Sequence, residues 1–300
     1  MERLRVVGGA RLAGTVRVSG AKNSALKLMA ATLLAPGKST ITNLPAIADV
    51  EYMAELLTRL GCTVEINHQL SQVEIDVPEK LGHRADYDMV RKMRASINVL
   101  GPLIARELVA EVALPGGDAI GSRGLDFHIN GLTEMGAQVT SEHGFVIAKA
   151  SNGLTGAHIT LEFPSVGATE NIMTAATLAK GITTIDNAAR EPDVVDLGEF
   201  LIAMGAKISG LGSHTITIEG VKKLNPTAHA TLADRIVAGT WAFAAAMTKG
   251  DITIENGRAD HLELPLDKLV EAANAAVSVT LTNSRARLRS GKLNSADICT

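Results

Sequence analysis

The chain has 300 residues, in which 29 lysines and arginines stand against 32 aspartates and glutamates, and only 3% of its residues are aromatic. This balance argues against a nucleic-acid-binding surface, which needs excess cations and stacking rings. Cys62 and Cys299 are too few and too far apart for a disulfide framework or a thiolate metal site, and no apolar run has membrane-spanning length. We expect a cytoplasmic protein of two domains that binds neither nucleic acid nor a membrane.

The first polar cluster is the segment SGAKNS at residues 19–24. A strand ending near Val18 is expected to meet a helix beginning about Asn23, with Lys22 at the junction. Because helix N-termini attract anions and Lys22 adds a full positive charge, one interpretation is a site for phosphate or carboxylate. The alternative is a helix cap with a solvated lysine.

A pattern of amphipathic helix, breaker and strand occurs four times along the chain, which indicates internal repeats. The four segments are residues 50–64, 125–139, 194–208 and 263–277, and their breakers are Gly61, Gly136, Gly205 and Asn274. Gly and Asn are the residues that end helices in the left-handed conformation. Ala/Leu-rich helices followed by Thr/Ile/Val strands lie between these segments, at residues 23–42, 175–185 and 244–254. The sequence therefore predicts α/β units of about 70 residues each.

Three cations, Arg91, Lys92 and Arg94, stand at the expected start of another helix. The helix dipole disfavours positive charge there unless an anion is near, so the position suggests a ligand. Of the three, only Arg94 stands beside small residues that would let a ligand approach. The alternative is a basic surface patch.

A glycine-rich loop at residues 114–123, LPGGDAIGSR, combines one carboxylate, Asp118, with one guanidinium, Arg123. A strand-like run precedes the loop and a helix is expected from Leu125, so backbone N–H groups and Arg123 would meet an anion beside a helix N-terminus. These residue types suit acid/base chemistry on an anionic substrate. The alternative is a tight strand-to-helix turn with solvated side chains.

These motifs together resemble those of one enzyme family. The segments SGAKNS, MRASINVLGPL, LPGGDAIGSR, SVGATENIM and NAAREPDVVDL are similar, in order and spacing, to those of the UDP-N-acetylglucosamine 1-carboxyvinyltransferases, which are enolpyruvyl transferases. The resemblance implies an α/β (α+β) fold of two lobes, each an inside-out α/β barrel of three βαβαββ units. About four of the six units would be present here.

The resemblance also implies the reaction and the groups that perform it. The enolpyruvyl group of phosphoenolpyruvate would pass to the 3-hydroxyl of UDP-N-acetylglucosamine with release of phosphate, the first committed step of peptidoglycan precursor synthesis, with no cofactor and no metal. Lys22, Asn23 and Arg123 would bind phosphoenolpyruvate, and Asp118 would be the general acid. The nucleotide sugar would meet Arg94, the stretch from Arg123 through Gly124, Leu125, Asp126 and Phe127, and the turn Ser165, Val166 and Gly167.

Two departures from the family pattern bear on function. Asp118 stands where most relatives have the cysteine that fosfomycin alkylates, so the resemblance implies an enzyme insensitive to that antibiotic. Relatives also continue through two further repeat units, so we expect a fragment with a complete lobe at residues 22–231 and an incomplete lobe at residues 1–21 and 232–300. The sequence assigns no oligomeric state.

Two other functions stay open. One is an enolpyruvyl transferase acting on shikimate 3-phosphate, which shares the fold but has different loop motifs. The other is a non-catalytic repeat scaffold, for which the charges at Lys22, Arg94, Asp118 and Arg123 would have no use.

Overall fold

The computed structural model describes residues 3, 5, 7–90, 93–114, 124–272, 277–282 and 285–290. The chain forms two compact units. The larger unit is Lys22–Leu232, and the smaller unit combines Met1–Ala21 with Ala233–Thr300. Within the described residues, no helix has both the length and the apolar character that a membrane crossing requires.

The described residues form four sheets of four strands with a single strand order, in which the first pair is parallel and the other pairs are antiparallel. Three sheets belong to the larger unit. They are β13 (Ala228–Ala230), β2 (Gly37–Thr42), β4 (Gln72–Val77) and β3 (Thr63–Asn67); β5 (Arg84–Ala85), β6 (Val109–Ala113), β8 (Phe145–Lys149) and β7 (Gln138–Glu142); and β9 (His158–Thr160), β10 (Ile182–Asp186), β12 (Thr215–Glu219) and β11 (Lys207–Ser209). The smaller unit holds the fourth, made of β1 (Ala13–Arg17), β14 (Asp251–Glu255), β16 (Arg285–Ser290) and β15 (Val277–Thr282).

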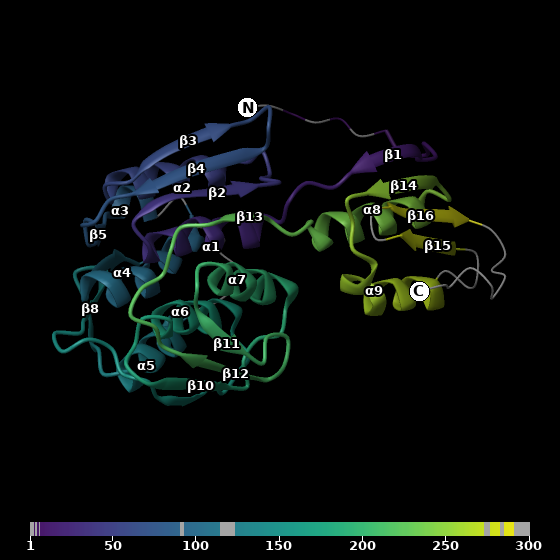
Figure 1. Ribbon diagram of the computed structural model, residues 1–300. Helices are drawn as coiled ribbons and strands as arrows, with labels where there is room; N and C mark the ends of the chain where they lie inside the picture. The colour runs from purple at the N-terminus through teal and green to yellow at the C-terminus, as the bar shows by residue number, and fades with distance from the viewer. Residues whose placement is uncertain are drawn as a thin grey trace. The chain divides into compact units, whose positions relative to one another are not determined.

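The helices of the larger unit lie between its sheets, as Figure 1 shows. They are α1 (Lys22–Ala31), α2 (Ala48–Arg59), α3 (Tyr87–Val90), α4 (Leu100–Glu107), α5 (Asp126–Glu134), α6 (Val166–Ala176) and α7 (Pro192–Ala203), with 3₁₀ turns η1 (Thr32–Leu34) and η2 (Arg94–Val99). The α6 helix packs against α4, α5, α7 and η2, and every residue from Ala168 to Ala176 is buried. A helix buried on all sides needs apolar or internally paired side chains all round. This arrangement confirms the predicted inside-out α/β fold.

The repeated glycine breakers end three helices in the same way. Gly61, Gly136 and Gly205 all have positive φ, between 90° and 107°. At the first, Gly61 N–H donates to Thr58 and Cys62 N–H donates to Leu57, and the other two ends repeat this pattern. Such paired bonds satisfy the last helical carbonyls. The predicted helix ends are therefore confirmed at all three glycines, while Asn274 lies outside the described residues.

Cys62, the residue after the first breaker, is part of the apolar core of the larger unit. Burial raises the pKa of its thiol to about 12. A thiol with so high a pKa is protonated at neutral pH and is a poor nucleophile. Cys62 therefore acts as a small core side chain.

In two of these sheets, the strand that pairs in parallel comes from a distant part of the chain. We call these two strands, β1 and β13, the exchanged strands. The first strand of the β13–β2–β4–β3 sheet comes from residues 228–230, after the third repeat, whereas β1 from the N-terminal segment pairs with β14. In the smaller unit, the segment before α1 pairs with the segment after β13. Gly20 forms a β-bridge with Ala233, and Asp234 N–H donates to the Ser19 carbonyl.

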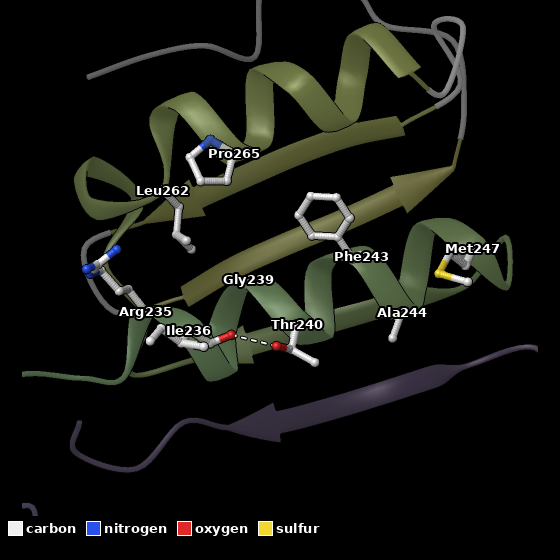
Figure 2. Close-up of a pocket in the computed structure, with 9 residues that line it drawn as sticks. All are labelled: Arg235, Ile236, Gly239, Thr240, Phe243, Ala244, Met247, Leu262 and Pro265. Atoms are coloured by element: carbon white, nitrogen blue, oxygen red, sulfur yellow. Dashed lines mark hydrogen bonds between the residues drawn. The ribbon is translucent and has the colours of Figure 1, made fainter. Parts of the chain in front are cut away.

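The smaller unit has an apolar groove between α8 (Arg235–Met247) and α9 (Glu263–Ala272), beside the turn η3 (Ala259–His261) (Figure 2). Its volume is about 480 Å³. The residues that line it are Arg235, Ile236, Gly239, Thr240, Phe243, Ala244, Met247, Leu262 and Pro265. Of α8, only four small residues are buried, and Met247 is 84% exposed. The outer face of α8 is thus apolar and accessible.

Candidate functional site

Lys22 is the first residue of α1, one position earlier than the sequence predicts. Its ammonium group forms an ion pair with Asp49 in the first turn of α2, and the lysine side chain is half-exposed. Asn23 follows and is also exposed. The body of α1 beyond them is buried from Ser24 onward, except for the partly buried Lys27. The packed helix therefore places a cation and an amide at its accessible end, close to the helix N-terminus.

Arg94 begins the 3₁₀ turn η2, and Asp126 begins α5. The charges of both residues act on the buried ring of His128. The pKa of His128 is lowered to about 4, mainly by burial and also by the positive charge of Arg94, whereas the negative charge of Asp126 acts to raise it. The ring is therefore neutral at physiological pH, and His128 Nδ1 lies 2.8 Å from Asn171 Nδ2. Because the amide nitrogen donates, Nδ1 accepts and the ring proton is on Nε2.

Ser165, Val166 and Gly167 form the start of α6 rather than a free turn. Ser165 is the N-cap, and its hydroxyl oxygen accepts from Ala168 N–H at 3.4 Å. Gly167 faces His128, because an added Cβ at Gly167 would lie 3.2 Å from His128 Cε1. The structure therefore brings η2, the start of α5 and the first turn of α6 together around one buried histidine.

The four residues from Gly124 to Phe127, where α5 begins, are of two kinds. Leu125 and Phe127 are partly buried and pack against the core of the larger unit. Gly124 and Asp126 are exposed, and an added Cβ at Gly124 would lie 2.5 Å from an Asp126 carboxylate oxygen. The apolar pair fixes the start of the helix, which leaves the glycine backbone and the carboxylate accessible to a ligand.

Several predicted residues lie outside the described residues. They are Asp118 and Arg123 of the glycine-rich loop, together with Arg91 and Lys92. Both ends of the loop are described, since Leu114 N–H donates to Gly144 at 2.7 Å after β6, and Gly124 precedes α5. The loop that would carry the general acid thus leaves from a strand and returns beside Asp126.

Sequence reasoning missed a row of buried polar residues in α6. Glu170 is 1% exposed, and its Oε1 lies 3.1 Å from Lys27 Nζ on α1. Burial raises the pKa of Glu170 from its ordinary value near 4.5 to about 7, with Lys27 opposing. The available signal was the tripeptide Thr169-Glu170-Asn171 inside an otherwise small and apolar helix, where three consecutive polar residues cannot all face solvent.

Comparison with a family model gives a match over residues 6–298. The model describes EPSP synthase (3-phosphoshikimate 1-carboxyvinyltransferase). The match covers almost the whole chain, including both compact units.

Individual proteins give closer matches. The chain is 59% identical to the UDP-N-acetylglucosamine 1-carboxyvinyltransferase of Corynebacterium jeikeium over 93% of this chain and 66% of that protein. The protein of the same name from Mycobacterium tuberculosis is 56% identical over 96% of this chain and 67% of its own length. The crystal structure of the enolpyruvyl transferase NikO from Streptomyces tendae matches with a TM-score of 0.81 at 22% identity, over 94% of this chain and 66% of that one. The chain thus spans about two thirds of the length of these proteins.

Proposed function

The chain belongs to the EPSP synthase (3-phosphoshikimate 1-carboxyvinyltransferase) family, and we propose that it serves the transfer of the enolpyruvyl group of phosphoenolpyruvate to the 3-hydroxyl of UDP-N-acetylglucosamine. Phosphate is the other product. The reaction supplies the first committed precursor of peptidoglycan, and through it cell wall growth, cell shape and division, from a cytoplasmic location. No cofactor or metal ion takes part in this proposal.

The acceptor is the part of the proposal that needs most support, since the family model is named for shikimate 3-phosphate. The observation that carries it is the identity of 59% and 56% to two proteins named for the nucleotide sugar, against 20% to a solved EPSP synthase from Acinetobacter baumannii. The geometry agrees, because Arg94, Asp126 and the first turn of α6 surround His128. A diphosphate and a sugar need this mixture of cation, carboxylate and free backbone N–H groups.

The proposed chemistry begins with delivery of a proton to the methylene carbon of phosphoenolpyruvate, for which Asp118 is the general acid. The sugar hydroxyl then attacks the adjacent carbon and gives up its proton to water, and the tetrahedral intermediate loses phosphate together with one proton of the new methyl group, which restores the enol double bond. Lys22, Arg94 and Arg123 hold the anionic substrates, and the helix ends of α1 and α6 add partial positive charge. Asn23 completes the phosphoenolpyruvate site beside Lys22.

The test compares UDP-N-acetylglucosamine with shikimate 3-phosphate in two measurements, the binding of each to the chain and the turnover that each supports. Calorimetric titration of the chain with UDP-N-acetylglucosamine should give saturable binding, and shikimate 3-phosphate should give none. Phosphate release from phosphoenolpyruvate is measured with each acceptor in parallel, and Asp118→Asn should abolish it wherever it is seen. Preferential binding of shikimate 3-phosphate would assign the other acceptor, and binding of neither would favour a repeat scaffold.

Fosfomycin gives a separate prediction for Asp118. A carboxylate is a much poorer soft nucleophile than a thiolate, so incubation with fosfomycin should leave the intact mass of the chain unchanged. The matched variant Asp118→Cys should gain the mass of one fosfomycin molecule. A covalent adduct at Asp118 in the parent chain would contradict the prediction.

A further inference from the structure

The helix α6 is fixed by three consecutive buried side chains, each with a different neighbour. Thr169 Oγ1 accepts from Ala189 N–H at 3.1 Å, in the segment before α7. Glu170 reaches Lys27 on α1, and Asn171 accepts from Gly101 N–H at 3.0 Å on α4. Consecutive helical residues point about 100° apart, so the three contacts act in three directions around the helix axis.

The Glu170–Lys27 ion pair lies just behind the candidate substrate site. Glu170 follows Gly167 by three residues on α6, and Lys27 follows Lys22 by five on α1. At 1.5 Å per residue, the pair is about 5–8 Å along each helix from the end that carries the candidate ligands. It therefore links α1 to α6 just beyond the first turn of each helix.

Stability alone does not account for this pair. Its two side chains are 11% and 1% exposed, so both charges have left water. A buried pair of this kind is often matched or exceeded in stability by apolar side chains of similar volume. In addition, neither oxygen of the Glu170 carboxylate has a hydrogen-bond partner among the described residues, and its contact with Lys27 is an ion pair at 3.1 Å. The other charges acting on Glu170 come from Asp193 of α7 and from Glu191, the N-cap of that helix, and both repel its carboxylate. Among the charges of the described residues that act on Glu170, Lys27 is the attractive one.

We propose that Glu170 is a positioning residue that acts through Lys27 to fix the first turn of α6 relative to the first turn of α1. Neither residue touches substrate in this role. The pair sets the spacing between Lys22 and Asn23 on one helix and Ser165 to Gly167 on the other. The inference rests on the proposed function only for the claim that this spacing governs substrate affinity.

The experiment compares the parent chain with four variants. Glu170→Gln and Lys27→Met each remove one charge, and the double variant Lys27→Met/Glu170→Leu replaces the pair with apolar side chains. Thr174→Val is the matched control, because the Thr174 hydroxyl is buried on the same helix but bonds only the carbonyls of Glu170 and Asn171 within that helix. Two quantities are measured, the affinity for UDP-N-acetylglucosamine and the hydrogen exchange of the Ala168 and Thr169 amides.

We expect both single variants to raise exchange at Ala168 and Thr169 about tenfold and to weaken binding about as much, while Thr174→Val changes neither. The double apolar variant should unfold at a urea concentration no lower than the parent does, yet keep the weakened binding and the faster exchange. Recovery of parent binding and exchange in the double variant would overturn the proposal, because the pair would then serve packing alone. Equal effects of Thr174→Val would overturn it as well.

Failure of the proposed function is distinguishable from failure of this inference. If the parent chain does not bind UDP-N-acetylglucosamine, the acceptor is wrong, and the exchange measurement, which uses no ligand, still decides whether Glu170 positions α6.

Discussion

Replacement of Asn171 by leucine is expected to lower the free energy of unfolding of the chain by about 3–5 kcal/mol. The Asn171 amide accepts from Gly101 N–H at 3.0 Å and donates to the Ile97 carbonyl at 3.2 Å and to His128 Nδ1 at 2.8 Å. Leucine has a similar volume but removes the Asn171 bond from the buried Gly101 N–H and from His128 Nδ1, at about 1–3 kcal/mol each before relaxation, while the Ile97 carbonyl keeps its bond from Leu100 N–H. Urea unfolding followed by circular dichroism measures the loss.

The exposed Asn152 supplies the control for this substitution. Asn152→Leu should change the free energy of unfolding by less than about 0.5 kcal/mol, since no buried partner depends on its side chain. An equal loss in the two variants would show that the three-way bond of Asn171 does not hold α4, α5 and α6 together.

Glu170 should make the stability of the chain depend on pH. Its pKa in the folded state, about 7, lies above its ordinary value near 4.5, so the folded chain binds the proton more tightly than the unfolded chain does. Stability from this group is therefore fully present below about pH 4.5 and is lost as pH rises to about 7. The loss amounts to about 3 kcal/mol, at 1.36 kcal/mol per pKa unit.

Urea titrations of the parent and Glu170→Gln at several pH values between 4.5 and 8 test this prediction. The stability of Glu170→Gln relative to the parent should rise with pH by about 3 kcal/mol and then remain constant. Glu162→Gln, which removes a carboxylate at an exposed position, is the matched control. A constant difference for Glu170→Gln would mean that burial does not perturb its titration.

Most of the fold could be predicted from the residues that end helices and from the repeat spacing of the sequence. Gly61, Gly136 and Gly205 marked three helix ends because few residues adopt positive φ at low cost. The repeat spacing then predicted units of two helices with strands, and the four identical sheet orders agree with it. The motif order added the inside-out arrangement, which periodicity alone does not distinguish from other α/β folds.

The site was less accessible to sequence reasoning, because its parts lie on three separate segments. Arg94 and Asp126 were singled out as charged residues, but nothing in their spacing indicated that both act on His128. The turn that the resemblance implied at Ser165, Val166 and Gly167 is the start of α6, where Gly167 gives room for the His128 ring. Lys27 and Glu170 were missed because a single helix pattern does not indicate which residue on a distant helix will be its partner.

The exchanged strands also determine when each unit can be completed during synthesis. Asn43 in the larger unit bonds Thr231, 188 residues later, and Asn256 in the smaller unit bonds Val18, 238 residues earlier. A nascent chain therefore leaves the ribosome with β2 lacking its parallel neighbour until β13 emerges, and β1 stays unpaired longer still. Contacts so distant in sequence slow folding, and an unpaired edge invites association with other chains. Newly made copies should depend on chaperones until the segment after β13 has been translated.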